Sequence, residues 1–187
     1  MSYTSQRPLF VSFVGGSSGL WRIERMYPVV GEGLPVADRL DVRESFTLST
    51  VQDGLWTLRG VTSNARYIIR EEADELTRRQ ECLMRPTATC AALIPIRKTE
   101  AWWALAQDER RRIFEESSHH TRVGLEYLPA IARRLHHSRE LGEPFDFLTW
   151  FEYAPEHQSA FEELVKRLRE TEEWQYVDRE IDLRLRR

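Results

Sequence analysis

Cysteine is scarce in this sequence, and the two residues present form no recognisable motif. Cys82 and Cys90 are the only cysteines in 187 residues, and seven residues separate them. This spacing fits neither a zinc knuckle, nor a redox CxxC pair, nor the CxxCH segment that tethers a c-type haem. We therefore expect both cysteines to be packing residues and any cofactor to be bound without a covalent link.

Other catalytic motifs are missing as well. The glycine-rich segment 15–19 has neither GxGxxG spacing nor the lysine of a phosphate-binding loop, so it indicates a turn. No HExxH pair is present, which leaves a zinc hydrolase without support. The adjacent acids Glu115 and Glu116 are typical of a solvated helix surface.

Neither sign of charge predominates, and long apolar runs are lacking. Lys and Arg number 27 against 30 Asp and Glu, and no basic run is interleaved with aromatic residues, so a nucleic-acid partner is not expected. No segment approaches the roughly 20 apolar residues that cross a bilayer. Residues 1–10 lack the basic and apolar regions of a signal peptide. We expect a cytoplasmic protein without a membrane partner.

What is present is the composition of an ordinary globular protein, with 41% hydrophobic and 30% charged residues. Residues 1–89 show extended stretches at 8–14, 20–30 and 55–61, separated by loops that contain Gly or Pro. A helical pattern follows at 69–83. This half is expected to be rich in strands, with one helix.

Residues 90–187 show a more complete alternation of patterns. The expected elements are a strand at 91–96, a helix at 99–118, extended segments at 123–135 and 145–153, a helix at 156–172 and a strand at 176–185. This is the split βαβ order of a ferredoxin-like unit. A degenerate version of that order fits the first half. The prediction is an α+β subunit made of two ferredoxin-like halves.

The histidines cluster between residues 119 and 157. They form the pairs His119-His120 and His136-His137, with His157 alone. Adjacent side chains point to opposite faces of a strand and diverge by about 100° on a helix, so at most one of each pair can face a given site. One of them could be the axial ligand of a haem iron, although a surface pair at a helix end has the same pattern.

Three further clusters have both a functional and a plain structural interpretation. Arg133 interrupts an apolar stretch, where a permanent charge requires an anion or a partner, or else lies at a solvated strand edge. Lys98 with Trp102 and Trp103 could hold an acidic cofactor edge or simply pack in the core. The carboxylates at 172–173 end a helix unfavourably, which indicates either a specific partner or solvation.

Four segments of the chain carry a resemblance to a known family. Residues 91–103 (AALIPIRKTEAWW), 117–120 (SSHH), 127–139 (YLPAIARRLHHSR) and 146–153 (DFLTWFEY) resemble the chlorite dismutase family. The resemblance runs in order over roughly residues 60–187, and the short first half is similar to the compact dimeric branch. It implies two ferredoxin-like halves in a dimeric α/β-barrel subunit, with haem b in the C-terminal half.

The resemblance also implies roles for individual residues. His120 corresponds to the proximal iron ligand, so His119 is the non-ligand of the pair. Arg133 corresponds to the distal arginine. Glu173 corresponds to the carboxylate that hydrogen-bonds the proximal imidazole, with Glu172 as the alternative.

Six further positions follow from the same resemblance. Lys98, Trp102 and Trp103 match residues around the haem propionates and porphyrin edge. Thr149 and Phe151 match residues that line the pocket. Gln80 corresponds to the glutamine that contacts the distal arginine in the compact branch.

The implied function is a haem b-dependent conversion of chlorite to chloride and dioxygen by a cytoplasmic homodimer. Arg133 suits this reaction because its guanidinium stays cationic and can hold an anion. Alternatives are a peroxidase-like or coprohaem decarboxylase-like relative and a non-catalytic haem carrier or sensor. The decarboxylases generally lack the distal arginine and the proximal glutamate, so Arg133 and Glu173 argue against that alternative.

Overall fold

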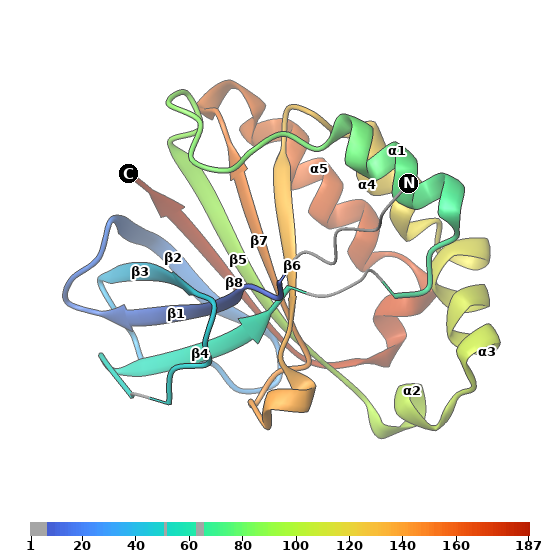
Figure 1. Cartoon of the computed structure of the whole chain (residues 1–187), viewed down its shortest axis with the longest axis horizontal. Coiled ribbons are helices and arrows are strands. Elements are labelled where there is room, and N and C mark those ends of the chain that lie inside the picture. The colour runs from blue at the N-terminus through green and yellow to red at the C-terminus, as the bar shows by residue number, and fades with distance from the viewer. Residues whose placement is uncertain (1–6, 51, 63–65) are drawn as a thin grey trace.

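The computed structural model describes residues 7–50, 52–62 and 66–187 (Figure 1). The first half contributes β1 (Phe10–Gly16), β2 (Trp21–Val30), β3 (Arg39–Ser45), β4 (Trp56–Val61) and α1 (Arg70–Arg79). The second half contributes β5 (Cys90–Lys98), α2 (Glu100–Ala104), α3 (Gln107–Arg111), α4 (His120–Glu126), β6 (Ala132–His137), β7 (Phe147–Tyr153), α5 (Gln158–Arg169) and β8 (Val177–Arg186). A π-helical turn at Arg112–Ser117 precedes α4, and 3₁₀ turns occupy Arg139–Leu141, Pro155–His157 and Glu172–Tyr176.

The strands of both halves form one closed antiparallel barrel. Its order is β1-β3-β2-β8-β5-β7-β6-β4, and the helices lie to one side of it (Figure 1). The strands of the second half are consecutive in this order, as β8-β5-β7-β6. Among the described residues, the barrel closes between β4 and β6 through one residue pair, Val61 with His137. In the described ranges, no helix is both long and apolar enough to cross a membrane.

Strand β5 separates two hydrophobic cores. Ala91 and Leu93 point into the barrel, where they pack with Phe13, Trp21 and Trp150. The alternate residues of β5 face the helices and pack in a second core with α5: Cys90, Ala92, Ile94 and Ile96. Because side chains alternate along a strand, β5, which is buried on both faces, appears in the sequence as a continuous apolar run.

The first half departs from the expected split βαβ order. Residues 17–20 connect β1 directly to β2 without a helix, and α1 follows all four strands. Strand β3 was not expected, because Arg39–Ser45 has only Leu40 and Val42 as apolar residues among charged ones. It pairs with β1 along its whole length, so backbone hydrogen bonding to a neighbour, and not its own pattern, makes it a strand.

Two expectations for the second half are also corrected. The single helix expected at 99–118 is divided into α2, α3 and the π-helical turn, because the chain is extended at Leu105 and Ala106. The extended segment expected at 123–135 begins instead as helix α4, and only β6 is extended. The order strand, helices, strand, strand, helix, strand is nevertheless present in this half.

Candidate functional site

A cavity of about 320 Å³ lies between the helices and the adjoining face of the barrel. Strands β5, β6 and β7 line one side, and α1, α4 and α5 line the other. Its apolar lining residues are Leu76, Ile94, Ile96, Trp102, Phe114, Leu135, Phe147, Phe151, Leu164, Val165, Leu168 and Trp174. Its polar and charged lining includes Arg66, Gln80, Lys98, His120, Arg133, His137, Thr149 and Glu173. A largely apolar cavity with a few convergent polar groups is typical of a cofactor site.

His120 enters the cavity from the first turn of α4. The preceding residue, His119, adopts a left-handed conformation with φ 53°, which ends the π-helical turn and redirects the chain. Glu115 caps the new helix, since its Oε2 accepts the N–H of Thr121 at 2.6 Å and its Oε1 accepts that of Arg122 at 3.2 Å. The carboxylate therefore determines where α4 starts and which way His120 points.

The His120 imidazole is held on two sides. Phe114 stacks on it with ring centroids 4.4 Å apart and planes 20° from parallel. Its Nδ1 donates to Glu173 Oε2 at 2.6 Å, so it is Glu173 that makes this contact. The backbone N–H of Glu173 donates in turn to Ser118 Oγ at 3.0 Å, which ties the turn after α5 to the turn before α4. The Nε2 atom of His120 is left available to a ligand.

Lys98 neutralises the Glu173 carboxylate inside the protein. Its Nζ lies 2.8 Å from Glu173 Oε1 and 3.2 Å from the Glu173 carbonyl oxygen, and the lysine is 3% exposed. Burial alone would raise the pKa of Glu173, but the positive charge of Lys98 and the contact with His120 lower that pKa to about 2. Glu173 is therefore ionised, and it accepts the His120 hydrogen bond as a carboxylate.

Arg133 has no such partner. It projects from β6, it is surrounded by protein, and its accessible surface faces the cavity. Burial lowers the pKa of its guanidinium, and only the more distant charge of Glu115 opposes that effect. It makes no hydrogen bond or salt bridge with any described residue. Gly124 leaves room beside it, since a Cβ added there would lie 3.4 Å from Arg133 Cζ. A buried unpaired cation of this kind favours an anion.

The remaining predicted residues are distributed unevenly around the cavity. Trp102, Thr149, Phe151 and Gln80 line it. The indole N–H of Trp102 is buried without a hydrogen-bond partner among the described residues. Gln80 donates from Nε2 to the carbonyl oxygen of Glu81 at 2.8 Å, and among the described residues it makes no hydrogen bond with Arg133.

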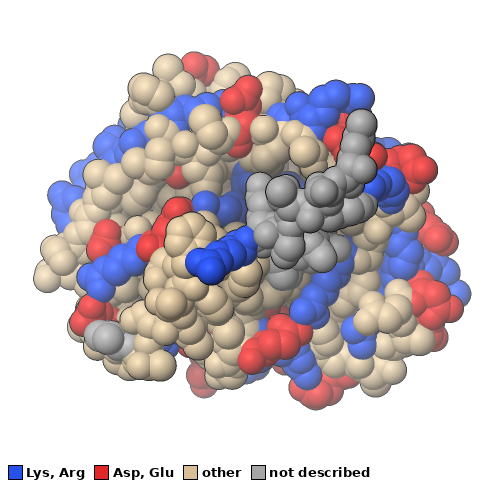
Figure 2. All heavy atoms as spheres, in the orientation of Figure 1, with Lys and Arg blue, Asp and Glu red and all other residues tan. Residues whose placement is uncertain are grey.

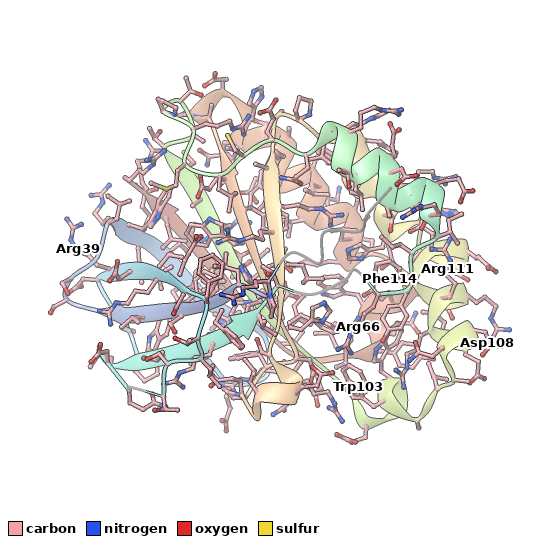
Figure 3. All side chains as sticks on the ribbon, viewed as in Figure 1. Arg39, Arg66, Trp103, Asp108, Arg111 and Phe114 are labelled. Carbon is pink, nitrogen blue, oxygen red and sulfur yellow. The ribbon has the colours of Figure 1, made fainter. Side chains whose placement is uncertain are left out.

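Trp103 lies outside the cavity lining. Its Nε1 donates to Asp146 at 3.2 Å, its ring stacks on Phe147, and the guanidinium of Arg139 lies 4.1 Å from its ring centre. Its neighbour Trp102 lines the cavity instead, because adjacent residues of α2 diverge around the helix. Figure 3 shows Trp103 on the same side of the barrel as Arg66 and Phe114, with Arg39 at the opposite end of the molecule.

Comparison with known proteins identifies the family of this chain. Residues 39–185 match the sequence model of the family described as Chlorite dismutase. The chain belongs to the chlorite dismutase family. The match begins at β3 and includes every residue that lines the cavity.

Individual members of the family are similar to different extents. A dimeric chlorite dismutase from Nitrobacter winogradskyi is 56% identical, with a TM-score of 0.87 over 95% of this chain and 99% of that one. A chlorite dismutase from Ideonella dechloratans is 30% identical over 98 residues, which is 51% of this chain and 33% of the relative. This chain thus spans about a third of the length of that curated relative. The chlorite dismutase from Candidatus Nitrospira defluvii, at 22% identity and a TM-score of 0.68, shares the fold.

Several residues of this family member escaped sequence reasoning. Glu115 was expected on a solvated surface beside Glu116, but it is only 8% exposed and caps α4. Ser118 and Phe114 hold Glu173 and His120, and His137 lines the cavity. An acid that caps a helix from several residues before its start has no distinctive local pattern. The sequence therefore does not indicate that Glu115 is the buried acid and Glu116 the exposed one.

Proposed function

We propose that this chain binds haem b and converts chlorite to chloride and dioxygen. One observation carries the proposal: a single apolar cavity contains a histidine bound to an ionised carboxylate, His120 with Glu173, and an unpaired buried cation, Arg133. The first group suits an axial ligand of a metal, and the second suits a small anionic substrate. Membership of the chlorite dismutase family, whose activity depends on haem, supports both assignments.

The cavity fits the proposed cofactor in three respects. Its walls are largely apolar, as a porphyrin face requires. The hydrogen bond from His120 Nδ1 to Glu173 leaves Nε2 for the iron and makes the imidazole a stronger electron donor. The unpartnered N–H of Trp102 is a buried donor at the cavity wall, where a bound group could lie.

The protein contributes binding, orientation and electrostatics to this reaction. Haem iron, when bound, supplies a centre that can accept an oxygen atom from chlorite and return it. Arg133 binds the chlorite anion and retains the chlorine-containing fragment until the O–O bond forms, since its charge does not depend on pH in the working range. The overall reaction, ClO2⁻ to Cl⁻ and O2, moves no proton, so no general acid is required.

The finer statements about assembly and architecture belong to the same proposal. We infer a homodimer, supported by the dimeric relative from Nitrobacter winogradskyi. We also infer a ferredoxin-like C-terminal half, residues 90–187, that holds the haem, supported by its element order and its antiparallel strand order β8-β5-β7-β6. Residues 1–89 would form the shortened half, and the protein would act in the cytoplasm.

Two measurements test the function. The purified protein, supplied with haem b, should show the absorption spectrum of a histidine-ligated ferric haem, and an oxygen electrode should record O2 release when chlorite is added. A protein that binds no haem would refute the cofactor assignment. A haem-loaded protein that releases no O2 would favour a carrier or sensor.

A further inference from the structure

Glu180, on β8, is a buried carboxylate at the wall of the cavity. It is 0% exposed and it lines the cavity together with Glu173 and Trp174. Acidic and basic side chains are interspersed at the surface of the molecule in Figure 2, whereas this acid is enclosed by protein. A charge that is removed from water is costly even when it is paired, so its place in the fold indicates a specific contact.

Two donors contact this carboxylate, and only one of them depends on it. Arg169 donates from Nε to Glu180 Oε1 at 2.8 Å, but its Nη2 also donates to Asp182 Oδ2 at 2.8 Å. Arg169 would therefore keep a counter-ion without Glu180. The indole N–H of Trp174 donates to Glu180 Oε2 at 2.8 Å, and among the described residues it has no other acceptor. The contact that requires Glu180 is the one with Trp174.

Trp174 adjoins the groups that hold His120. It follows Glu173 in the 3₁₀ turn Glu172–Tyr176. The Nζ atom of Lys98 lies 5.5 Å from the ring centre of Trp174 and 4.7 Å from that of Trp102. The ammonium group that neutralises Glu173 is therefore flanked by two indoles, which stabilise a cation where water is excluded.

The orientation of the Trp174 ring depends on its hydrogen bond. The ring packs against the core beside α5, but the residue is only partly buried. Packing on one side restricts the rotation of a ring less than enclosure does, whereas a hydrogen bond to a buried carboxylate restricts it directly. Glu180 thus determines which face of the indole Lys98 meets.

We propose that Glu180 is a positioning residue, which acts through the indole of Trp174 on the turn that carries Glu173. This inference rests on the proposed function, because the contact between Glu173 and His120 affects an iron only when haem is bound. Without the anchor, the Trp174 ring rotates away from Lys98 and water reaches the ion pair. Glu173 then accepts a weaker hydrogen bond from His120 Nδ1, and the imidazole becomes a weaker electron donor.

The test uses three substitutions that separate the hydrogen bond from the charge. Trp174→Phe removes the indole N–H but keeps a ring and every charge. Glu180→Leu removes both the acceptor and the charge, whereas Glu180→Gln removes the charge and keeps an acceptor oxygen. Two quantities are measured: the proton NMR signal of the His120 Nδ1–H in the haem-free protein, and the reduction potential of the protein loaded with haem b.

Trp174→Phe and Glu180→Leu should move the His120 signal upfield and raise the reduction potential. At a fixed applied potential the ratio of ferrous to ferric protein should increase roughly 3- to 10-fold, the worth of one hydrogen bond. The double variant should show no further change, because both substitutions break the same contact. Glu180→Gln should lie closer to the wild type than to Glu180→Leu in both measurements.

The matched control is Trp56→Phe, which also removes one indole hydrogen bond, to the carbonyl oxygen of Pro35 at 2.9 Å, but outside the cavity lining. It should leave both quantities unchanged. Trp174→Phe would refute the positioning role if it behaved like this control. Equal shifts in Glu180→Gln and Glu180→Leu, with none in Trp174→Phe, would show that Glu180 acts by its charge alone and would also refute it. A wild type that binds no haem would refute the proposed function, and the His120 signal of the haem-free protein would still decide whether Glu180 positions Glu173.

Discussion

The two walls of the cavity differ in how far their charged groups are satisfied. Around the first turn of α4, His120 and Glu173 form a continuous series of contacts with Lys98, which reaches them from the end of β5, at 2.6 and 2.8 Å. On the β6 side, Arg133 makes no hydrogen bond and His137 lacks a partner at Nδ1 within the described chain. We call the first wall saturated, because its charged groups are paired, and the second unsaturated. Paired groups are suited to holding a cofactor rigidly, whereas unpaired groups are suited to a ligand that binds and dissociates.

Removal of His120, which lies at the end of these contacts, should have the largest effect on haem binding. We expect His120→Ala to abolish stable haem binding, because no other described histidine is placed to ligate iron from this wall. His119→Ala should retain haem, since the Nδ1 of His119 is turned to the carbonyl oxygen of Glu115. Absorption titration with haem b measures both. Equal binding by the two variants would show that the ligand has been assigned wrongly.

Removal of the carboxylate in the middle of these contacts should lower the free energy of unfolding. Glu173→Ala leaves Lys98 buried without its counter-ion, and breaking a buried pair typically costs about 3 to 5 kcal/mol of unfolding free energy. The variant should still take up haem, with a higher iron reduction potential, because the imidazole becomes a weaker donor. Urea unfolding and spectroelectrochemistry measure the two effects. The exposed neighbour serves as control, and Glu172→Ala should change neither quantity.

On the unsaturated wall, the corresponding change should affect turnover and not cofactor binding. Arg133→Ala should bind haem normally but lose about 2 to 4 kcal/mol of transition-state stabilisation, or roughly 10² to 10³ in rate. Escaped hypochlorite should also bleach the haem, so fewer O2 molecules are released before inactivation unless methionine is present as a scavenger. Arg134→Ala, which removes a surface pair with Glu44, is the control. An Arg133→Ala enzyme with unchanged rate and total turnover would remove the arginine from the mechanism.

Loss of the α4 cap should weaken the saturated wall more gently. Glu115→Ala removes the acceptor for two backbone N–H groups at the start of α4, which typically costs about 0.5 to 2 kcal/mol of stability. Because His120 is the first residue of that helix, haem should also dissociate faster. Thermal unfolding and haem transfer to apomyoglobin measure the two effects. Glu116→Ala is exposed and should match the wild type in both.

The smallest expected effect lies on the opposite face of β6. His136 is fully buried, its Nδ1 donates to Leu148 at 2.9 Å, and burial lowers its pKa to about 3. The unfolded chain therefore binds a proton between about pH 6.5 and 3 that the folded chain refuses, so stability falls as the pH falls through that window. Between pH 7 and pH 6 the loss should stay below about 1 kcal/mol. His136→Gln should reduce the pH dependence of urea unfolding, and an unchanged slope would contradict this assignment.

The sequence alone predicted most strands of the barrel and named candidate residues for the site. Strong patterns such as the apolar run of β5 and the stripe of α5 give elements close to those observed, because burial of a whole face leaves a periodic trace. The motif positions of His120, Glu173 and Arg133 could be read from the family resemblance. The weakly patterned β3 could not, since it is a strand only because β1 pairs with it.

Only the tertiary structure decided which partners these residues have. Lys98 looked like a cofactor-edge cation in the sequence, yet it binds Glu173, which is 75 residues away along the chain. Glu115 looked solvated, yet it caps the helix that carries His120. Burial and charge pairing depend on which distant segments pack together, and the local sequence does not indicate which segments these are. This is the physical reason why the sequence named the candidate ligands, whereas the fold determined which of them are satisfied and which remain open to a ligand.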